Sequence, residues 1–303
     1  VLTTSVAELI DRCDVVFEAS GDALHGTDVL LEVLRAGRPI VTMDSELQVT
    51  TGSWFARRGS ITEADGDQPG CLARLAEEAR CHGFQPLAYV NLKGFLDPTP
   101  SLEQMAYWSE RQDLRLEQVV SFTDGTKLQT EQVLVANGLG AELACEGLIG
   151  PAVESFQEAT PLVEAARRLG RPISDYLLWK GGPPGVLILA DHPESRALPG
   201  YLPFSRLFVG DERPCFCLLR SHHLIHLEVP RTLRDVRDGK GPLLTNSLRP
   251  RFGLAAVTKR RLRPGAVLER GVGSFDVRGV ATRLADRPDH VPATLLAGAR
   301  VRH

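Results

Sequence analysis

Hydrophobic and polar positions at the start of the chain alternate in a pattern typical of an α/β sheet. Residues 14–22 form an apolar run that leads into a glycine turn, which predicts a buried strand. Residues 27–36 carry apolar side chains at helical spacing, and Gly37 follows where such a helix would end. Residues 39–43 are a second apolar run. Strand, helix, glycine and strand in this order predict a parallel sheet, whose ligands usually bind at the carboxyl ends of its strands.

Between residues 53 and 150 the pattern predicts amphipathic helices separated by polar loops. Helices are expected over residues 53–59, 71–82, 101–113 and 126–138, and strands over residues 60–62 and 84–90. Clusters of glycine, proline and polar residues predict loops over residues 66–70, 91–94 and 121–127.

Beyond residue 150, glycine and proline become frequent and short apolar runs replace most helices. Strands are expected over residues 186–189, 216–219, 254–258 and 275–281, and residues 259–265 predict a strand followed by a turn. The whole pattern predicts an α/β segment followed by an α+β segment that becomes rich in strands toward its end.

Composition and charge narrow the class of protein. A content of 43% hydrophobic and 24% charged residues is ordinary for a globular enzyme, and 303 residues allow two or three domains. A net charge of -3 gives no electrostatic attraction to nucleic acid or to an anionic membrane. No apolar run reaches the roughly 18 residues that span a bilayer. We therefore expect a small-molecule substrate, with neither nucleic acid nor membrane as a partner.

The first residues indicate whether the chain is truncated, and the cysteines indicate the compartment of the protein. The chain begins with Val1 instead of Met and lacks the cationic and apolar regions of a signal peptide, so we interpret it as N-terminally truncated. Its six cysteines are scattered without a C-x-x-C pair, which disfavours a zinc site. Scattered cysteines in a chain of this length are typical of a reduced, cytoplasmic protein.

The densest polar cluster is Asp124-Gly125-Thr126-Lys127, with Glu131 after it. If a helix starts near Thr126, Lys127 and Glu131 are i, i+4 neighbours on one face. A lysine beside carboxylates suits carbonyl reduction, because it can stabilise a developing alkoxide and deliver a proton. Spacing alone favours the simpler interpretation, a capped helix with a surface ion pair.

Three further segments carry polar side chains, but they indicate a function less specifically than the cluster around Lys127. The loop that contains Asn91 and Lys93 offers a second cation that suits an anionic substrate group, but spacing alone favours a solvated loop. Residues 66–70 are consistent with either a turn that faces the substrate or a plain connecting loop. The histidines of residues 222–226 suggest a metal site, but no third ligand is evident nearby, so we favour a structural role.

The sequence contains no glycine-rich loop of the dinucleotide-binding kind. Residues 138–140 follow a predicted helix, and residues 271–273 lie in a strand-rich stretch without a third glycine. Such a loop must follow a strand and open a helix so that the backbone can approach a pyrophosphate. Residues 14–46 therefore fit the later strands of a dinucleotide-binding domain.

Several stretches together resemble one family, the homoserine-dehydrogenase-like oxidoreductases with a C-terminal SAF domain. The resembling pieces recur in order over nearly the whole chain, at residues 17–21, 41–46, 66–70, 121–127, 136–138, 147–151, 220–224 and 256–265. The resemblance implies NAD or NADP as cofactor and a homodimer. It also implies the C-terminal part of a Rossmann-type sheet over residues 1–52, an α+β catalytic domain over residues 53–235 and a small β-rich SAF-like domain over residues 236–303.

The resemblance also assigns roles to individual residues. It implies that Lys127 is the catalytic lysine and that Asp124, Glu131 and Lys93 line the substrate pocket. The cofactor-binding residues that it implies are Ala19, Ser20 and Gly21 beside the nicotinamide, with Asp44 in the next turn. The chain departs from the expected pattern in two places. One expected lysine is absent from residues 90–94, and Asp44 stands where asparagine is expected.

Three functions follow as hypotheses. The first is an NAD(P)-dependent oxidoreductase that moves a hydride to or from a small hydroxy or carbonyl compound. The second is a metal-dependent enzyme similar to 1-deoxy-D-xylulose 5-phosphate reductoisomerase, with Asp124 and Glu131 as oxygen ligands of a divalent ion. The third is a non-catalytic metabolite-binding protein on a truncated dehydrogenase frame.

Overall fold

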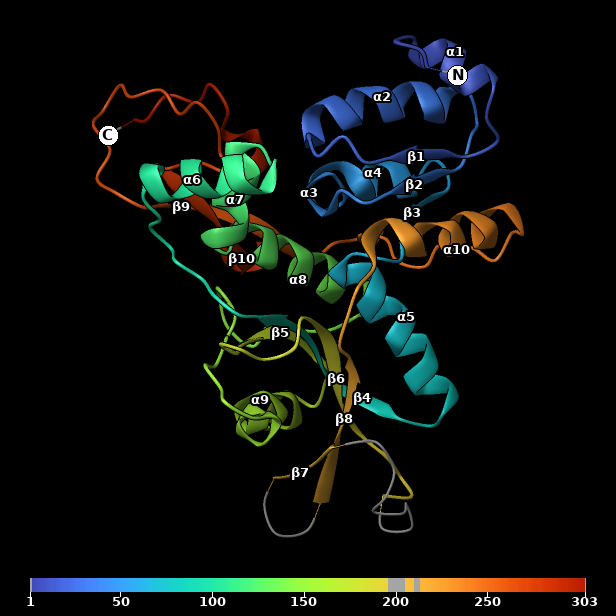
Figure 1. Cartoon of the computed structure of the whole chain (residues 1–303), viewed down its shortest axis with the longest axis vertical. Helices are drawn as coiled ribbons and strands as arrows, with labels where there is room; N and C mark the ends of the chain where they lie inside the picture. Colours follow the sequence, from blue (N-terminus) through green and yellow to red (C-terminus); the bar gives the residue numbers. More distant parts are fainter. Residues whose placement is uncertain (1, 196–204, 210–212, 303) are drawn as a thin grey trace.

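The computed structural model describes residues 2–195, 205–209 and 213–302. Its first part is a three-stranded parallel sheet in the order β1-β2-β3, here called the N-terminal sheet. The elements of this part are α1 (Val6–Asp11), β1 (Val16–Glu18), α2 (Ala23–Arg35), β2 (Ile40–Thr42), α3 (Ser45–Leu47), a π-helical turn (Gln48–Gly52), α4 (Ser53–Ala56) and β3 (Ile61–Glu63). Figure 1 shows α2 above this sheet, with its inward face buried through Leu30 and Val33.

The second part is a mixed five-stranded sheet in the order β5-β4-β6-β8-β7, here called the central sheet. Its strands are β4 (Gln85–Lys93), β5 (Ile173–Leu178), β6 (Gly185–Asp191), β7 (Ser205–Val209) and β8 (Arg213–Arg220). On one face lie α5 (Gln68–Cys81) and α8 (Thr126–Leu139), and on the other lies α9 (Thr160–Leu169), which follows a 3-10 turn (Phe156–Ala159). Alternate residues of β4 serve the two faces, so Ala88 and Val90 face α9 whereas Tyr89 faces α5.

The third part is the antiparallel pair β9 (Phe252–Thr258) and β10 (Val277–Arg283), here called the C-terminal hairpin. It packs against α8 through Phe252 and Ala281, and two 3-10 turns follow it (Leu284–Asp286 and Ala293–Leu296). The helices α6 (Leu102–Gln112) and α7 (Leu116–Thr123) lie beside it, where Met105 and Val119 meet Phe275 (Figure 1). Helix α8 is therefore buried on nearly every side.

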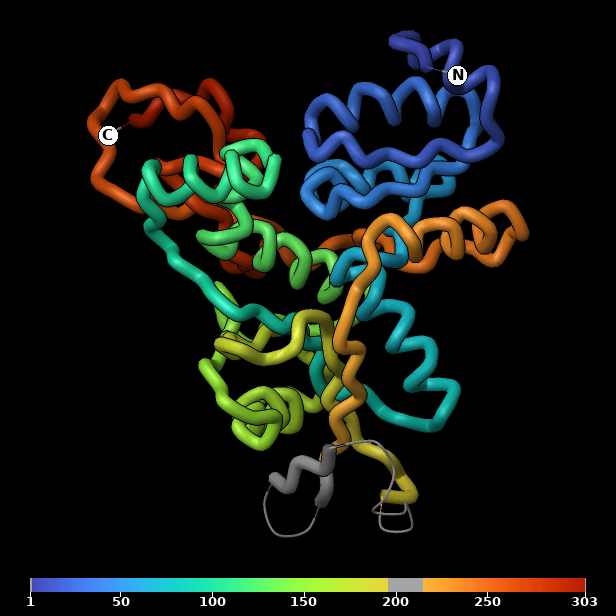
Figure 2. The backbone as a smooth tube through the Cα atoms, viewed as in Figure 1, coloured from blue at the N-terminus to red at the C-terminus, as the bar shows by residue number. Residues whose placement is uncertain are grey.

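The last helix, α10 (Ile225–Arg237), returns from the central sheet to the N-terminal sheet. Val229 of this helix packs with Val41 and Ala64. Figure 2 shows that the two ends of the chain lie at the same end of the molecule, away from α9. In the part of the chain that the structure describes, no helix combines the length and the apolar character needed to cross a membrane.

The α/β class expected from the pattern is confirmed by the parallel and mixed sheets. The loop predicted over residues 121–127 is wrong in extent, because α7 runs to Thr123 and leaves only Asp124 and Gly125 as a turn. The loop predicted over residues 91–94 is also wrong, because β4 continues to Lys93. Both segments are polar yet packed between other elements, and tertiary contacts override local composition there.

Two further differences concern the second half of the chain. The segment after Thr258 is not a strand, because β9 ends there and a long connection leads to β10. The helix α10 continues through Pro230, although proline lacks the N–H that would bond the carbonyl of His226. The proposed domain boundaries stay predictions, although the N-terminal sheet extends to Glu63.

Candidate functional site

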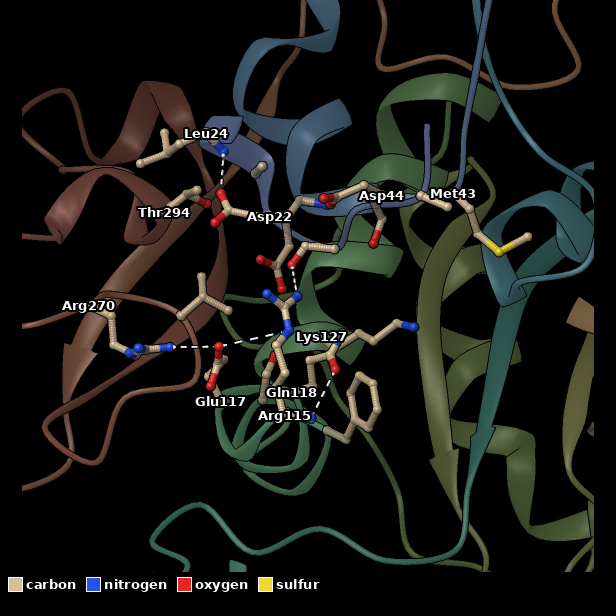
Figure 3. Close-up of a pocket in the computed structure, with 18 of the residues that line it drawn as sticks. Asp22, Leu24, Met43, Asp44, Arg115, Glu117, Gln118, Lys127, Arg270 and Thr294 are labelled. Atoms are coloured by element: carbon tan, nitrogen blue, oxygen red, sulfur yellow. Dashed lines mark hydrogen bonds and ion pairs between the residues drawn. The ribbon is translucent and has the colours of Figure 1, made fainter. Parts of the chain in front are cut away.

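A cavity of about 490 Å³ lies where the three parts of the molecule meet. The N-terminal sheet contributes the loops after β1 and β2, and α7 and the start of α8 contribute residues that include Lys127. The connection between β9 and β10 contributes residues 269–272, and Thr294 and Ala297 follow from the segment after β10. Figure 3 shows Asp22 and Asp44 on one side of this cavity, Arg115 and Glu117 in the middle, and Arg270 opposite. The cavity therefore lies at the carboxyl ends of parallel strands, where α/β proteins bind ligands.

Asp67 enters the site from the start of α5. It is the N-cap of this helix, and its carboxylate accepts a hydrogen bond from the amide of Gln68 at 3.0 Å. Gly70 allows the first turn of α5 to approach the preceding backbone, because a Cβ there would lie 1.9 Å from the carbonyl oxygen of Ala64. A glycine at this close contact therefore sets where Asp67 points.

Lys127 enters the site from the first turn of α8. Gly125 makes the sharp turn before this helix at φ +84°, and Asp124 accepts a hydrogen bond from the amide of Thr126 at 2.8 Å. The Nζ atom of Lys127 lies 3.0 Å from Oδ2 of Asp67 and 3.5 Å from Oε1 of Glu131. The expected i, i+4 pair of Lys127 and Glu131 is confirmed, and Asp67 is a second carboxylate partner from another helix.

Glu131 joins the lysine to the end of β4. It is fully buried, accepts a hydrogen bond from the side-chain amide of Asn91 at 2.8 Å, and lies 3.9 Å from Nζ of Lys93. Asn91 and Lys93 share a face of β4 because side chains alternate along a strand. Two segments that are 34 residues or more apart in the chain thus form one polar network.

The charges of this network determine its protonation at neutral pH. Burial lowers the pKa of Lys127, but Asp67 and Glu131 outweigh burial and raise it above its usual range. Burial raises the pKa of Asp67, but the ammonium of Lys127 outweighs that effect and holds it below its usual range. Lys127 and Asp67 are therefore an ionised pair, and Lys127 is a permanent cation at the cavity wall.

Three further carboxyl groups near Lys127, those of Asp44, Glu46 and Glu63, have no ion-pair partner among the described residues. Burial raises the pKa of Asp44 to about 6, with the charge of Glu18 adding to the rise. Burial and the charge of Asp44 raise the pKa of Glu46 to about 8. Both line the cavity. Burial also raises the pKa of Glu63 well above its usual range, and neither of its carboxyl oxygens has a hydrogen-bond partner among the described residues. The site therefore holds more carboxyl groups than cations.

The turn after β1 lines the cavity beside the loop after β2, because these two strands are parallel neighbours. Glu18 accepts hydrogen bonds from the amide and the hydroxyl of Ser20 at 2.8 and 2.7 Å, and from the hydroxyl of Thr42 at 2.7 Å. Gly21 adopts φ +65°, which favours glycine. Ala19 and Gly21 line the cavity, whereas the hydroxyl of Ser20 points to Glu18.

The residues expected from the sequence separate into two groups. Lys127, Asp44, Ala19 and Gly21 line the cavity, and Glu131 and Lys93 lie directly behind Lys127. Asp124 is not among the residues that line it. Its Oδ2 atom lies 2.6 Å from Nζ of Lys259, and both side chains are almost fully buried. Asp124 therefore anchors the start of α8 to the segment after β9.

Three site residues were not expected from the sequence. Asp67 lies in residues 66–70, and an aspartate two positions before a proline is a helix-start signal that can be recognised. Arg115 offers no such signal. His223 is half-buried, its Nδ1 atom has no hydrogen-bond partner among the described residues, and burial lowers its pKa near Asp67 and Lys127. Only the tertiary structure brings Arg115 and His223 to the site.

The described residues contain one group of three potential metal ligands within 4.8 Å of one another, formed by Asp65, Cys71 and Glu228. The guanidinium of Arg220 already bonds both carboxylates, at 3.1 Å to Asp65 and in close contact with Glu228. Burial raises the pKa of the Cys71 thiol to about 12, so it is not a thiolate. This group is therefore a charge-balanced contact that lacks the free ligands a metal requires.

Comparison with known proteins adds one finding. The family described as "Oxidoreductase DRL, catalytic domain" matches residues 66–229, which is more than half of the 303 residues. The matched segment contains Asp67, Lys93, Lys127 and Glu131. No curated protein matches the chain.

Proposed function

The chain belongs to the oxidoreductase family described as DRL, and we propose that it moves a hydride between a nicotinamide cofactor and a small hydroxy or carbonyl compound. Membership in the family makes the chain an oxidoreductase. The nicotinamide cofactor and the substrate class are the further steps of the proposal. The observation that carries them is the ammonium of Lys127, which is held by Asp67 and Glu131 at the wall of a cavity that also contains the turn after β1.

Lys127 acts in this proposal as a fixed positive charge. Its raised pKa keeps it protonated at neutral pH, so it stabilises negative charge on the substrate oxygen and does not take up protons as a base. Asp67 and Glu131 hold the ammonium from two sides and limit the positions it can adopt. Such preorganisation of a charge is usually the largest contribution of a protein to this kind of reaction.

A proton must also be exchanged when a carbonyl becomes a hydroxyl. Glu46 lines the cavity, and its pKa of about 8 lets it hold or release a proton near neutral pH. Asp44 is its neighbour, with a pKa of about 6. We assign the proton exchange to this pair of carboxyl groups, whereas Lys127 keeps its charge throughout.

The cofactor-side residues of the proposal are Ala19, Ser20, Gly21 and Asp44. Gly21 leaves the backbone of this turn open to the cavity, and the turn follows the edge strand of a parallel sheet, which suits a nicotinamide ring. When bound, the nicotinamide supplies or accepts the hydride. The resemblance to homoserine-dehydrogenase-like enzymes, the SAF-like character of the C-terminal hairpin, the homodimer and the cytoplasmic location belong to the same proposal.

The metal-dependent alternative is not favoured by the two ligands that it would use. Asp124 pairs with Lys259 at 2.6 Å, and Glu131 lies between Lys93 and Lys127. Both carboxylates are therefore already occupied by lysines. No step of the proposed reaction uses these two residues as metal ligands.

The test is Lys127→Met in the whole protein, with turnover followed by nicotinamide absorbance over a panel of small hydroxy and carbonyl compounds that includes homoserine. The substitution should lower kcat/KM by about 10² to 10³-fold and leave dinucleotide affinity within a few-fold, because the ammonium acts on the substrate oxygen. Lys180→Met is the matched control, since Lys180 is an exposed lysine outside the residues that line the cavity. Full activity of Lys127→Met would refute the proposal.

A further inference from the structure

Arg115 reaches across the cavity to the turn after β1. Its NH2 atom donates hydrogen bonds to the carbonyl oxygen of Gly21 at 2.6 Å and to that of Ser20 at 3.3 Å. Arg115 is the N-cap of α7, so the contact joins residues that are more than 90 positions apart in the chain. The two carbonyl groups belong to the turn that the proposed function assigns to the cofactor.

The fit between Arg115 and this turn is close. A Cβ at Gly21 would lie 2.9 Å from NH2 of Arg115 and 3.0 Å from the side-chain amide nitrogen of Gln118. Gly21 therefore admits the guanidinium where a larger residue would displace it. The side-chain oxygen of Gln118 accepts a hydrogen bond from the amide of Arg115 at 3.3 Å, which fixes the start of α7 beside the turn.

A second arginine, Arg270, is linked to Arg115 through the carboxylate of Glu117. Oε1 of Glu117 lies 3.9 Å from Nε of Arg115 and 3.3 Å from NH1 of Arg270. Figure 3 shows Glu117 between the two guanidinium groups at the cavity wall. Burial raises the pKa of Glu117, but its own backbone amide and Arg270 outweigh burial and lower it, so this carboxylate is ionised at neutral pH.

The helix that carries Arg115 also sets the position of Lys127. Helix α7 begins after Arg115 and ends at Thr123, and a two-residue turn leads from there into α8, whose second residue is Lys127. Phe122 of α7 lies against Lys127, with the ammonium 4.9 Å from the centre of the ring. A shift of α7 relative to the turn after β1 would therefore change the distance between the cofactor side and the catalytic ammonium.

We propose that Arg115 is a positioning residue that sets the spacing between the Ser20–Gly21 turn and Lys127, with Glu117 and Arg270 holding its guanidinium in place. This inference rests on the proposed function, because it treats the turn as the cofactor side of the reaction. An arginine suits the task since its planar group can bond two carbonyls and still face a carboxylate. Glu18 shapes the turn from within, whereas Arg115 ties it to α7.

The first experiment compares Arg115→Met with wild type in steady-state kinetics, using unlabelled cofactor and cofactor deuterated at the transferred position. The variant should lower kcat by about tenfold to a hundredfold, because hydride transfer depends steeply on the spacing of the reactants. Its deuterium isotope effect should rise, and KM for the substrate should change by less than about threefold. Arg111→Met is the matched control, because Arg111 packs over Tyr107 and Trp108 on α6, away from the cavity.

The second experiment tests the chain of contacts by combining substitutions. Glu117→Gln should reduce kcat less than Arg115→Met does, and Arg270→Met least of all. Arg115→Met combined with Arg270→Met should equal Arg115→Met alone, because Arg270 acts only through Glu117 on Arg115. Additive losses, or an unchanged isotope effect in Arg115→Met, would overturn the inference.

The third experiment needs no activity. Amide hydrogen exchange of residues 19–23 should be faster in Arg115→Met than in wild type, and unchanged in Arg111→Met. Unchanged exchange in Arg115→Met would show that the turn does not depend on Arg115 and would overturn the inference. A wild type without nicotinamide-dependent turnover would instead contradict the proposed function, and the exchange data would then decide alone whether Arg115 fixes the turn.

Discussion

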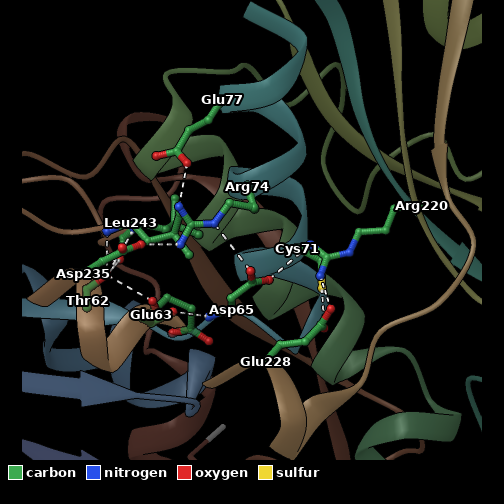
Figure 4. A network of polar contacts seen from close by, with 12 residues as sticks. Thr62, Glu63, Asp65, Cys71, Arg74, Glu77, Arg220, Glu228, Asp235 and Leu243 are labelled. Atoms are coloured by element: carbon green, nitrogen blue, oxygen red, sulfur yellow. Dashed lines mark hydrogen bonds and ion pairs between the residues drawn. The ribbon is translucent and has the colours of Figure 1, made fainter. Parts of the chain in front are cut away.

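Asp65 and Asp67 stand two positions apart in one loop, yet they belong to regions of opposite electrostatic character. Asp65 is bonded by two arginines, with Arg74 at 3.4 Å and Arg220 at 3.1 Å. Asp67 faces Lys127 in the cavity. Figure 4 shows the paired charges around Asp65, with Arg74 on α5, Arg220 at the end of β8, and Glu228 and Asp235 on α10.

The Asp65 region is close to charge balance. Arg74 also bonds Glu77 at 2.8 Å and Asp235 at 3.0 Å, and Asp235 is 2.8 Å from Lys240. In this network four carboxylates, Asp65, Glu77, Glu228 and Asp235, face the three cations Arg74, Arg220 and Lys240. The hydrogen bond from Lys240 lowers the pKa of Asp235, with Arg74 adding to the effect. Burial raises the pKa of Glu228, but the backbone amide of Leu224 and the guanidinium of Arg220 outweigh burial and lower it.

The cavity region is out of balance. Around Lys127 and Lys93 lie five carboxyl groups, those of Asp44, Glu46, Glu63, Asp67 and Glu131, and burial raises the pKa values of the first three. Because a protein tolerates uncompensated buried carboxyl groups only at a cost, they are more typical of a working site than of a structural contact. The balance of charges, and not the number of charged residues, therefore distinguishes the region that we propose as the active site from the structural network around Asp65.

The strongest test exchanges the two neighbouring aspartates for asparagine one at a time. Asp65→Asn should lower the free energy of unfolding by about 3 kcal/mol, because it leaves two nearly buried arginines short of a carboxylate. Asp67→Asn should cost less, about 1 to 2 kcal/mol, because Lys127 keeps Glu131 as a partner and asparagine still caps α5. Urea unfolding measures both values.

The same two variants should give the reverse order in kinetics. Asp67→Asn should lower turnover by about tenfold or more, because Lys127 loses one of its two holding groups. Folded Asp65→Asn, assayed well below its unfolding temperature, should stay within about threefold of wild type. Equal losses of activity in both variants would remove the distinction between the two regions.

Gly70→Ala tests the close contact that both regions share. The added Cβ would meet the carbonyl oxygen of Ala64 at 1.9 Å, so the first turn of α5 has to move. The expected cost is about 1 to 3 kcal/mol in unfolding free energy, together with a loss of turnover, because Asp67 moves with the helix. The control substitution is Gly239→Ala. A Cβ at Gly239 has open space around it, although the φ of +72° adds backbone strain at that position.

The smallest expected effect is the dependence of stability on pH. The folded pKa of Glu46, about 8, lies above its ordinary value, so its contribution to stability is complete below about pH 4.5 and is lost as the pH rises toward 8. Wild type should therefore lose roughly 1 to 2 kcal/mol more between pH 5 and pH 8 than Glu46→Gln, after allowance for the partial exposure of this side chain. Chemical unfolding at a series of pH values checks the difference, and identical slopes in the two proteins would contradict the raised pKa.

The sequence alone determined the local part of this picture. The spacing of apolar residues predicts the α/β start of the chain and most helices, because burial on one face produces that periodicity. The pair Lys127 and Glu131 follows from helical geometry once the start of α8 is placed near Thr126. The oxidoreductase class follows from the resemblance, and the family that matches residues 66–229 agrees with it.

The tertiary structure decided which charges face each other. The local pattern marks Asp67 as a helix start but does not show that it meets Lys127, whereas Asp65 meets two arginines. It also does not show that Asp124 meets Lys259 and Glu131 meets Lys127. Arg115 reaches the turn after β1 from a helix more than 90 residues away. Periodicity records which side of an element is buried, whereas the partner of a buried charge depends on how separate elements pack. Only the folded chain therefore shows Lys127 as a held cation among excess carboxyl groups.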